Sequence, residues 1–142
     1  MRSLTAFLII CIPLAPLARA ADFSGTWEID LRNPSERARK VECGVASFEL
    51  AQSGDRVIGS HTLATVGCGR INEGGSQTVK GVVVNDTAVL VVTSGRNGAV
   101  VLGSAALRGN RLHWRTLDEI RPGEPAGDSP LILGQGVLSR VK

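Results

Sequence analysis

The chain has 142 residues and a formal net charge of +3, and 43% of its residues are hydrophobic whereas only 4% are aromatic. This length suits one domain with a modest core of its own. Acidic and basic residues nearly balance, tyrosine is absent, and basic residues cluster only at residues 37–40. Because the usual signs of nucleic-acid binding are missing, we expect no nucleic-acid partner.

The start of the chain has the three parts of a removable export signal. Arg2 supplies the charge, residues 4–17 form an apolar run, and Ala18-Arg19-Ala20 is a small-residue cleavage site. We therefore expect residues 1–20 to be a signal peptide and residues 21–142 to form one β-barrel domain that is periplasmic or secreted. A membrane helix needs roughly 20 apolar residues, and no later segment approaches this, so no membrane span is expected.

The cysteines predict one disulfide. Cys11 lies within the predicted signal peptide, which leaves Cys43 and Cys68. An even pair in an oxidising compartment indicates a bond between them. A redox-active pair would favour a close Cys-x-x-Cys spacing, which is absent here. The structural disulfide should stabilise the fold by about 3 kcal/mol.

From residue 25 onward the sequence is typical of successive strands, with one short helical possibility at residues 35–40. Turn residues at Gly54, Asn85 and Gly109 supply the positive φ angles that tight hairpins require. The alternation of apolar and polar residues predicts strands at residues 25–31, 44–51, 56–65, 77–84, 87–93, 99–107, 111–116 and 131–141. Strands joined in order favour an all-β fold, an eight-stranded antiparallel up-and-down β-barrel, which has no free sheet edge.

Alternation also separates the interior of the barrel from its outside. Basic residues mark the outside of residues 111–116, so Leu112, Trp114 and Thr116 are expected inside. A tight turn at residues 109–110 would place Trp114 opposite Ala105 with Gly103 nearby, so that a large side chain meets small ones. The same rule assigns these residues to the interior: Ala46, Phe48, Leu50, Val57, Gly59, His61 and Leu63. Because Arg140 is assigned to the outside, the last strand should turn the following residues inward: Leu133, Gln135 and Val137.

The opening Gly25-Thr26-Trp27, the meandering strands and Arg140 near the end of the last strand resemble the calycin barrels, meaning lipocalins and avidin-like proteins, across residues 21–142. In lipocalins the first-strand Trp closes one barrel end beneath a basic residue of the last strand. The resemblance therefore implies structural roles for Trp27 and Arg140, which would form a cation and ring contact. The aromatic residues of a biotin pocket are largely missing, so biotin binding is not expected.

The chain also resembles secreted bacterial protease-inhibitor barrels, which share the signal, the size, the Gly-x-Trp opening and a single disulfide. Those inhibitors insert an N-terminal arm into a metalloprotease. Only Ala21 and Asp22 precede Phe23 here, so inhibition would have to use a loop, at residues 32–42 or 118–130.

No catalytic or metal-binding motif is present. The two histidines, His61 and His113, cannot make a three-ligand zinc site without carboxylates, and neither Gly-x-Ser-x-Gly nor His-Glu-x-x-His occurs. We therefore expect no enzymatic activity, no catalytic residue, no metal and no cofactor.

These features favour a binding protein that holds a small apolar ligand inside the barrel. The expected ligand-binding residues are His61, Leu63, Trp114, Thr116 and Gln135, although an interior His is often satisfied by neighbouring backbone instead. The alternative is a secreted protein inhibitor or partner-binding module that acts through the long loops. An interior filled by side chains would favour the alternative.

One outer face is unusually apolar. If the turn at Asn85-Asp86 is tight, Val84 pairs with Thr87 and Lys80 with Val91, and the charge of Lys80 marks this face as the outside. A contiguous apolar face predicts a homodimer, whereas strand propensity alone would also favour β-branched residues there. The expected interface residues are Val82, Val84, Val89, Val91, Val100 and Leu102.

Overall fold

The computed structural model describes residues 21–141, so the predicted signal peptide lies outside the described residues. The strands in this part are β1 (Gly25–Asp30), β2 (Val45–Ser53), β3 (Arg56–Ala64), β4 (Ile71–Asn72), β5 (Val79–Val84), β6 (Thr87–Thr93), β7 (Val100–Arg108), β8 (Arg111–Arg121) and β9 (Gln135–Arg140). A short helix, α1 (Pro34–Ala38), lies between β1 and β2. None of the helices in this part is long and apolar enough to cross a membrane.

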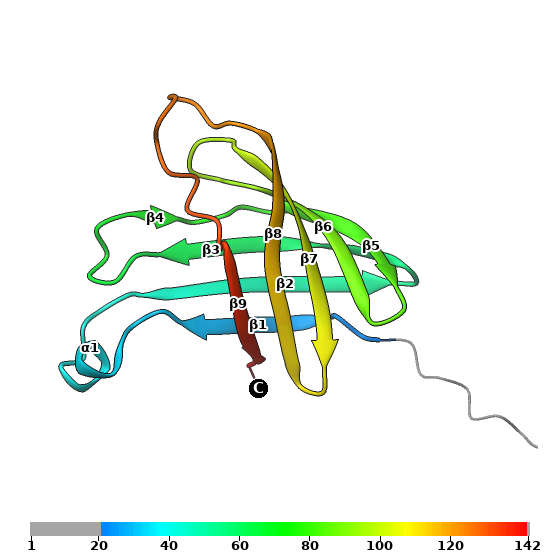
Figure 1. The fold of residues 1–142 in the computed structure, drawn as a ribbon, viewed down its shortest axis with the longest axis horizontal. Helices are drawn as coiled ribbons and strands as arrows, with labels where there is room; N and C mark the ends of the chain where they lie inside the picture. Colours follow the sequence, from blue (N-terminus) through cyan, green and yellow to red (C-terminus); the bar gives the residue numbers. More distant parts are fainter. Residues whose placement is uncertain (1–20, 142) are drawn as a thin grey trace, which may run out of the picture.

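The strands form one closed antiparallel barrel (Figure 1). Hydrogen-bonded neighbours follow the order β2-β1-β9-β8-β7-β6-β5-β3-β4, and a further pairing of β2 with β3 closes the sheet on itself. Because β4 is a two-residue addition to β3, the other eight strands form the wall. The predicted eight-stranded antiparallel up-and-down barrel is therefore confirmed.

The connections differ at the two ends of the barrel. Tight turns at residues 54–55, 85–86 and 109–110 lie at one end, where the chain also begins and ends its path through the sheet. At this turn end the Val141 amide donates to the Thr26 carbonyl over 2.8 Å. The long connections, residues 31–44, 65–78, 94–99 and 122–134, lie at the opposite end, which we call the loop end.

The turn end is closed by Trp27. Its ring is completely buried, and its Nε1 donates to the Phe23 carbonyl over 2.9 Å. The Arg140 guanidinium carbon lies 4.4 Å from the ring centroid, and Arg140 Nη2 donates to the Asp22 carbonyl over 2.8 Å. A first-strand ring beneath a last-strand cation is the arrangement that the calycin resemblance implied.

Large and small side chains alternate in the barrel interior. Trp114 pairs with Ala105 across β7 and β8, and a Cβ atom on Gly103 would lie only 2.0 Å from the Trp114 ring. Phe48 contacts the same ring, with centroids 4.9 Å apart. The residues predicted to face inward on β2 and β3 do so, since Ala46, Phe48, Leu50, Val57, His61 and Leu63 are buried.

The sequence-based orientation of β9 is wrong. Gln135 and Val137 face outward, whereas Gly136 and Leu138 face the interior. The error follows from Arg140, which was assigned to the outside because of its charge but lies over Trp27 at the turn end. A long cationic side chain at a strand terminus can cover an apolar ring and keep its charged head near solvent.

Element boundaries also differ from the sequence prediction. β8 continues to Arg121, five residues beyond the predicted end at residue 116. The prediction stopped early because shifts in strand register skip Leu117 and Ile120 and so interrupt the alternation of apolar and polar residues. β9 begins at Gln135 rather than at residue 131, and the short β4 was not predicted. The disulfide is confirmed, with Cys43 and Cys68 Cα atoms 5.2 Å apart and a sulfur–sulfur distance of 2.01 Å.

Candidate functional site at the loop end

The loop end is closed by residues 128–134, which we call the strap. After the β8–β9 loop turns back, the strap enters the barrel mouth before β9 begins (Figure 1). Leu131 and Leu133 are 6% and 5% exposed and belong to the barrel core. The strap therefore occupies the mouth where a ligand was expected.

The backbone of Leu133 forms hydrogen bonds with the polar side-chain groups of three of the predicted ligand-binding residues. Its amide donates to His61 Nε2 over 3.1 Å. Its carbonyl accepts hydrogen bonds from Trp114 Nε1 at 2.6 Å and from the Thr116 hydroxyl at 3.3 Å. The polar groups that a ligand would have met are thus bonded to the chain itself.

His61 is completely buried and bonded on both ring nitrogens. Nδ1 donates to the Ser47 carbonyl at 2.8 Å, because a carbonyl can only accept, and Nε2 accepts from Leu133. The ring stacks on Phe48 with centroids 4.4 Å apart. Burial lowers the pKa of His61 to about 4, although the hydrogen bond to Ser47 opposes this shift.

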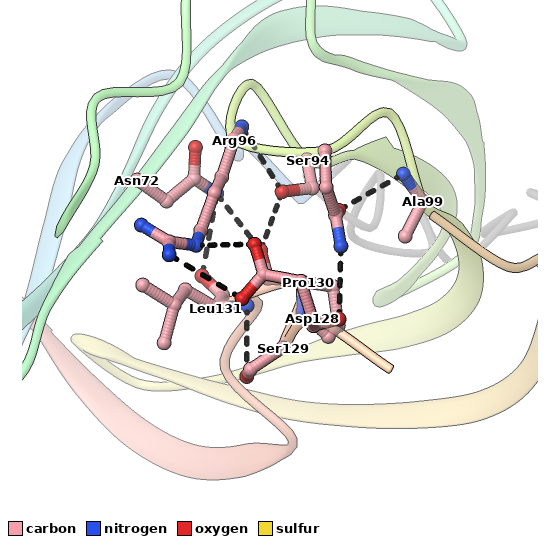
Figure 2. Close-up of polar contacts among 9 residues, drawn as sticks. Asn72, Ser94, Arg96, Ala99, Asp128, Ser129, Pro130 and Leu131 are labelled. Atoms are coloured by element: carbon pink, nitrogen blue, oxygen red, sulfur yellow. Dashed lines mark hydrogen bonds and ion pairs between the residues drawn. The ribbon is translucent and has the colours of Figure 1, made fainter. Parts of the chain in front are cut away.

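Polar side chains from the barrel rim hold the strap from above (Figure 2). Asn72 Nδ2 donates to the Leu131 carbonyl over 3.3 Å, and the Ser94 hydroxyl donates to the Pro130 carbonyl. Asn97 Nδ2 donates to the Asp128 carbonyl over 3.0 Å. Asn72, Ser94 and Asn97 are the buried polar residues of this rim, so the strap supplies the partners that buried polar groups require.

An ion pair completes this fastening. Arg96 Nε lies 2.9 Å from Asp128 Oδ2, and Arg96 Nη2 donates to Asp128 Oδ1 over 3.3 Å. None of these strap contacts is predictable from the sequence pattern. The four rim residues lie in loops or at strand ends, where polar side chains are ordinarily solvated. They are Asn72, Ser94, Arg96 and Asn97. No periodic pattern in the sequence connects them to the strap, which lies about 30 or more residues later in the chain.

The five predicted ligand-binding residues do not line one cavity inside the barrel, although Trp114 and Gln135 both border a groove on the outer wall. His61 and Trp114 are at most 2% exposed and Leu63 is 8% exposed. Gln135 lies on the outer surface. The interior is filled by its own side chains and by the strap, and this packing favours partner binding over a ligand held in the barrel.

The second prominent feature of the loop end is the α1 segment, residues 31–44. None of the five residues of α1 is buried, and in Figure 1 the helix stands apart from the barrel wall. A capping box fastens its start. Asn33 Oδ1 accepts from the Glu36 amide at 2.9 Å, and Glu36 Oε2 accepts from the Asn33 amide at 2.7 Å.

Arg32 and the disulfide fasten both ends of the α1 segment to the barrel. Arg32 Nε bonds Asp30 Oδ1 at 2.9 Å, and its Nη1 donates to the Val41 carbonyl at 2.9 Å. The hydrogen bonds from Arg32 lower the pKa of Asp30 to about 2. At the far end, Cys43 is bonded to Cys68 in the β3–β4 connection. The segment is therefore exposed, and both of its ends are tied to the barrel by these contacts.

Within residues 21–141, His, Cys, Asp and Glu side chains form no group of three or more that could hold a metal ion. In comparisons with known proteins, no family model, no curated protein and no solved structure matches this chain.

Proposed function

We propose that this chain is an exported, non-catalytic binding module that recognises a protein partner through the α1 segment. The observation that carries this proposal is a contrast at the loop end. The barrel interior is occupied by its own side chains and by the strap, whereas the α1 segment is exposed and projects from the wall.

The fastening of the α1 segment supports a role in binding. Its capping box, its contacts with Arg32 and the nearby disulfide hold a helix that buries no side chain of its own. Such fastening contributes little to the core, but it reduces the conformational entropy lost when a partner binds. A preorganised, projecting loop suits the secreted inhibitor or partner-binding alternative better than a ligand-carrying barrel.

The charge of the α1 segment suggests the chemistry of the partner. Arg37, Arg39 and Lys40 are exposed. Of the two glutamates, Glu36 is half-buried and bonded to the helix start and Glu42 is exposed, so basic residues predominate on the segment. An acidic partner surface would complement this arrangement. The other loop considered from the sequence, residues 118–130, is also largely exposed, but it begins within β8 and ends in the strap that closes the barrel.

Site-specific photocrosslinking in the compartment of origin tests this proposal. A photoreactive residue at Ala38 should give one defined protein adduct, whereas the same residue at Asn85, at the turn end, should not. The double exchange Arg39→Glu with Lys40→Glu should abolish the adduct. The matched exchange Arg56→Glu with Arg111→Glu, beside the tight turns of the opposite end, should preserve it. Equal adducts from both positions, or none from Ala38, would contradict the proposal.

Native mass spectrometry separates this function from storage of a small apolar ligand. The chain purified from its own source should show no bound small molecule, and any co-purifying protein should be lost with Arg39→Glu and Lys40→Glu. A constant mass increment from a retained apolar compound would instead support a ligand-carrying barrel.

Self-association through the outer face of β5, β6 and β7 is a second, separate proposal. Val82, Val84 and Val89 are 46%, 60% and 38% exposed. The other expected interface residues, Val91, Val100 and Leu102, are half-buried on the same outer face. Contiguous exposed apolar surface of this kind commonly marks an interaction site.

A further inference from the structure

The outer face of β7, β8 and β9 carries a groove that the loop-end proposal does not use. Its volume is about 730 Å³, within the range of roughly 300–1,000 Å³ for small-molecule sites. The polar residues along it are Thr87, Ser104, Arg108, His113, Arg115 and Gln135. Ala106 and Val137 provide an apolar floor between them.

Strand register places these side chains in rows on one face. Arg115 of β8 lies between Ser104 of β7 and Gln135 of β9. His113 lies in the next row, between Ala106 and Val137. Because successive side chains alternate between the faces of a sheet, these residues face outward while Leu112 and Trp114 fill the core.

The groove offers hydrogen-bond donors and no carboxylate. No Asp or Glu belongs to its lining. The ion pairs found among residues 21–141 are Asp30 with Arg32 and Arg96 with Asp128, so the guanidinium groups of Arg108 and Arg115 have no acidic partner there. A guanidinium group matches phosphate and carboxylate with two parallel hydrogen bonds.

We propose that this groove binds a soluble ligand that carries at least two oxyanion groups, phosphate or carboxylate. Arg108 lies four residues along β7 from Ser104, the partner of Arg115. At about 3.3 Å per residue, the two arginine positions are about 13 Å apart along the strands. A ligand with two separated anionic groups can engage both cations, whereas a single small anion engages one.

Recognition in this groove relies on side chains. β7, β8 and β9 each pair with a strand on both sides, so no free edge is available for an added peptide strand. The hydroxyl groups of Thr87 and Ser104 and the amide of Gln135 can donate to further ligand oxygens. These features favour a compact polyanion over an extended polypeptide.

Tripolyphosphate is a direct probe of this site. In an NMR titration of the mature chain at physiological salt, backbone amides of β7, β8 and β9 should shift, and tripolyphosphate should bind at least tenfold more tightly than orthophosphate. Arg108→Gln with Arg115→Gln should weaken binding at least tenfold. The matched exchange Arg56→Gln with Arg70→Gln, which removes the same charge outside the groove and the α1 segment, should change affinity less than twofold.

Two results would overturn the proposal. The first is an equal loss of affinity in both double variants, or chemical shift changes outside β7–β9, because either would indicate binding by net charge alone.

The second result concerns whether the oxyanion belongs to a soluble ligand or to a lipid headgroup. Co-sedimentation with vesicles of anionic phospholipid, absent with zwitterionic vesicles and lost with Arg108→Gln and Arg115→Gln, would assign the groove to a lipid headgroup instead of a soluble ligand.

Discussion

At the scale of single residues, His61 connects two parts of the barrel that are far apart in sequence. Ser47 of β2 fixes the proton on Nδ1, and the Leu133 amide of the strap fixes the lone pair on Nε2. A protonated ring would place a second N–H against the Leu133 N–H. The burial that lowers the pKa of His61 to about 4 and this opposed donor both keep the ring neutral.

The His61 environment predicts a pH-dependent stability. Well above pH 6.5 the ring is neutral in both states and the stability is fully present. As the pH falls below 6.5, the unfolded chain takes up a proton that the folded chain resists until about pH 4. The free energy of unfolding should therefore fall by about 2 kcal/mol between pH 7.5 and pH 5.

Urea unfolding at these two pH values measures this effect. His61→Gln should remove most of the pH dependence, although it lowers stability at both values. His113→Gln, on the outer face, is the matched control and should retain it. A parent chain that is equally stable at pH 7.5 and pH 5 would show that the His61 proton is not linked to folding.

A second residue-scale prediction concerns Gly103. A Cβ atom there would lie 2.0 Å from the Trp114 ring, whereas one on Gly134 would meet nothing within 4 Å. Gly103→Ala should therefore destabilise the fold by about 1–3 kcal/mol through overpacking, and Gly134→Ala should change stability much less. Thermal unfolding of both variants, with Gly103→Ala combined with Trp114→Leu as a rescue, checks this. Equal effects at both glycines would mean that Gly103 does not accommodate the ring.

At the scale of elements, sequence alternation predicted the strands that have regular partners and failed where a segment leaves that pattern. The pairs of Val84 with Thr87 and of Lys80 with Val91 are observed as expected, because a two-residue turn fixes their register. The strap could not be predicted, since its contacts run from single polar residues in separate loops to backbone carbonyls. The inverted orientation of β9 has a similar origin, because one terminal contact of Arg140 determined the assignment.

The turn-end closure gives an element-scale prediction. Trp27→Ala should cost about 3–5 kcal/mol, because it removes a completely buried ring. Arg140→Ala should cost only on the order of 1 kcal/mol. Within the described part of the chain, Arg140 Nε is buried without a hydrogen-bond partner, which offsets part of the ring contact.

Chemical denaturation of both variants measures the two costs. Val137→Ala, on the outer face of β9, is a suitable control because it removes a 42% exposed side chain from the strand that carries Arg140. A Trp27→Ala variant as stable as this control would show that β1 does not depend on the closing ring.

At the scale of the whole molecule, closure of the sheet leaves the outer surfaces as the places where association can occur. The apolar face on β5, β6 and β7 and the basic groove on β7, β8 and β9 adjoin along the same wall, since Val89 pairs with Ser104 and Ser104 with Arg115. A mainly apolar surface, interrupted by Lys80, therefore adjoins a mainly basic one on this wall. A partner or second copy meets different chemistry on each side.

The apolar face predicts a homodimer. Sedimentation at micromolar concentration should show a dimer, and Val89→Lys should dissociate it because the exchange introduces a charge at the centre of the face. Thr62→Lys, on the outer face of β3, is a control that should leave association unchanged. A single species of monomer mass in the parent chain would reject the interface.

The position of the chain ends gives the barrel a direction. The segments leading into β1 and out of β9 meet beside the tight turns, as the bond from Val141 to Thr26 shows, while the α1 segment and the strap lie at the opposite end. A molecule immobilised through either chain terminus would point its loop end away from the support. A carrier domain fused to either terminus would lie at the turn end, opposite the α1 segment and the strap. Binding measured on such an oriented surface should exceed binding measured after coupling through a cysteine introduced at Ala38.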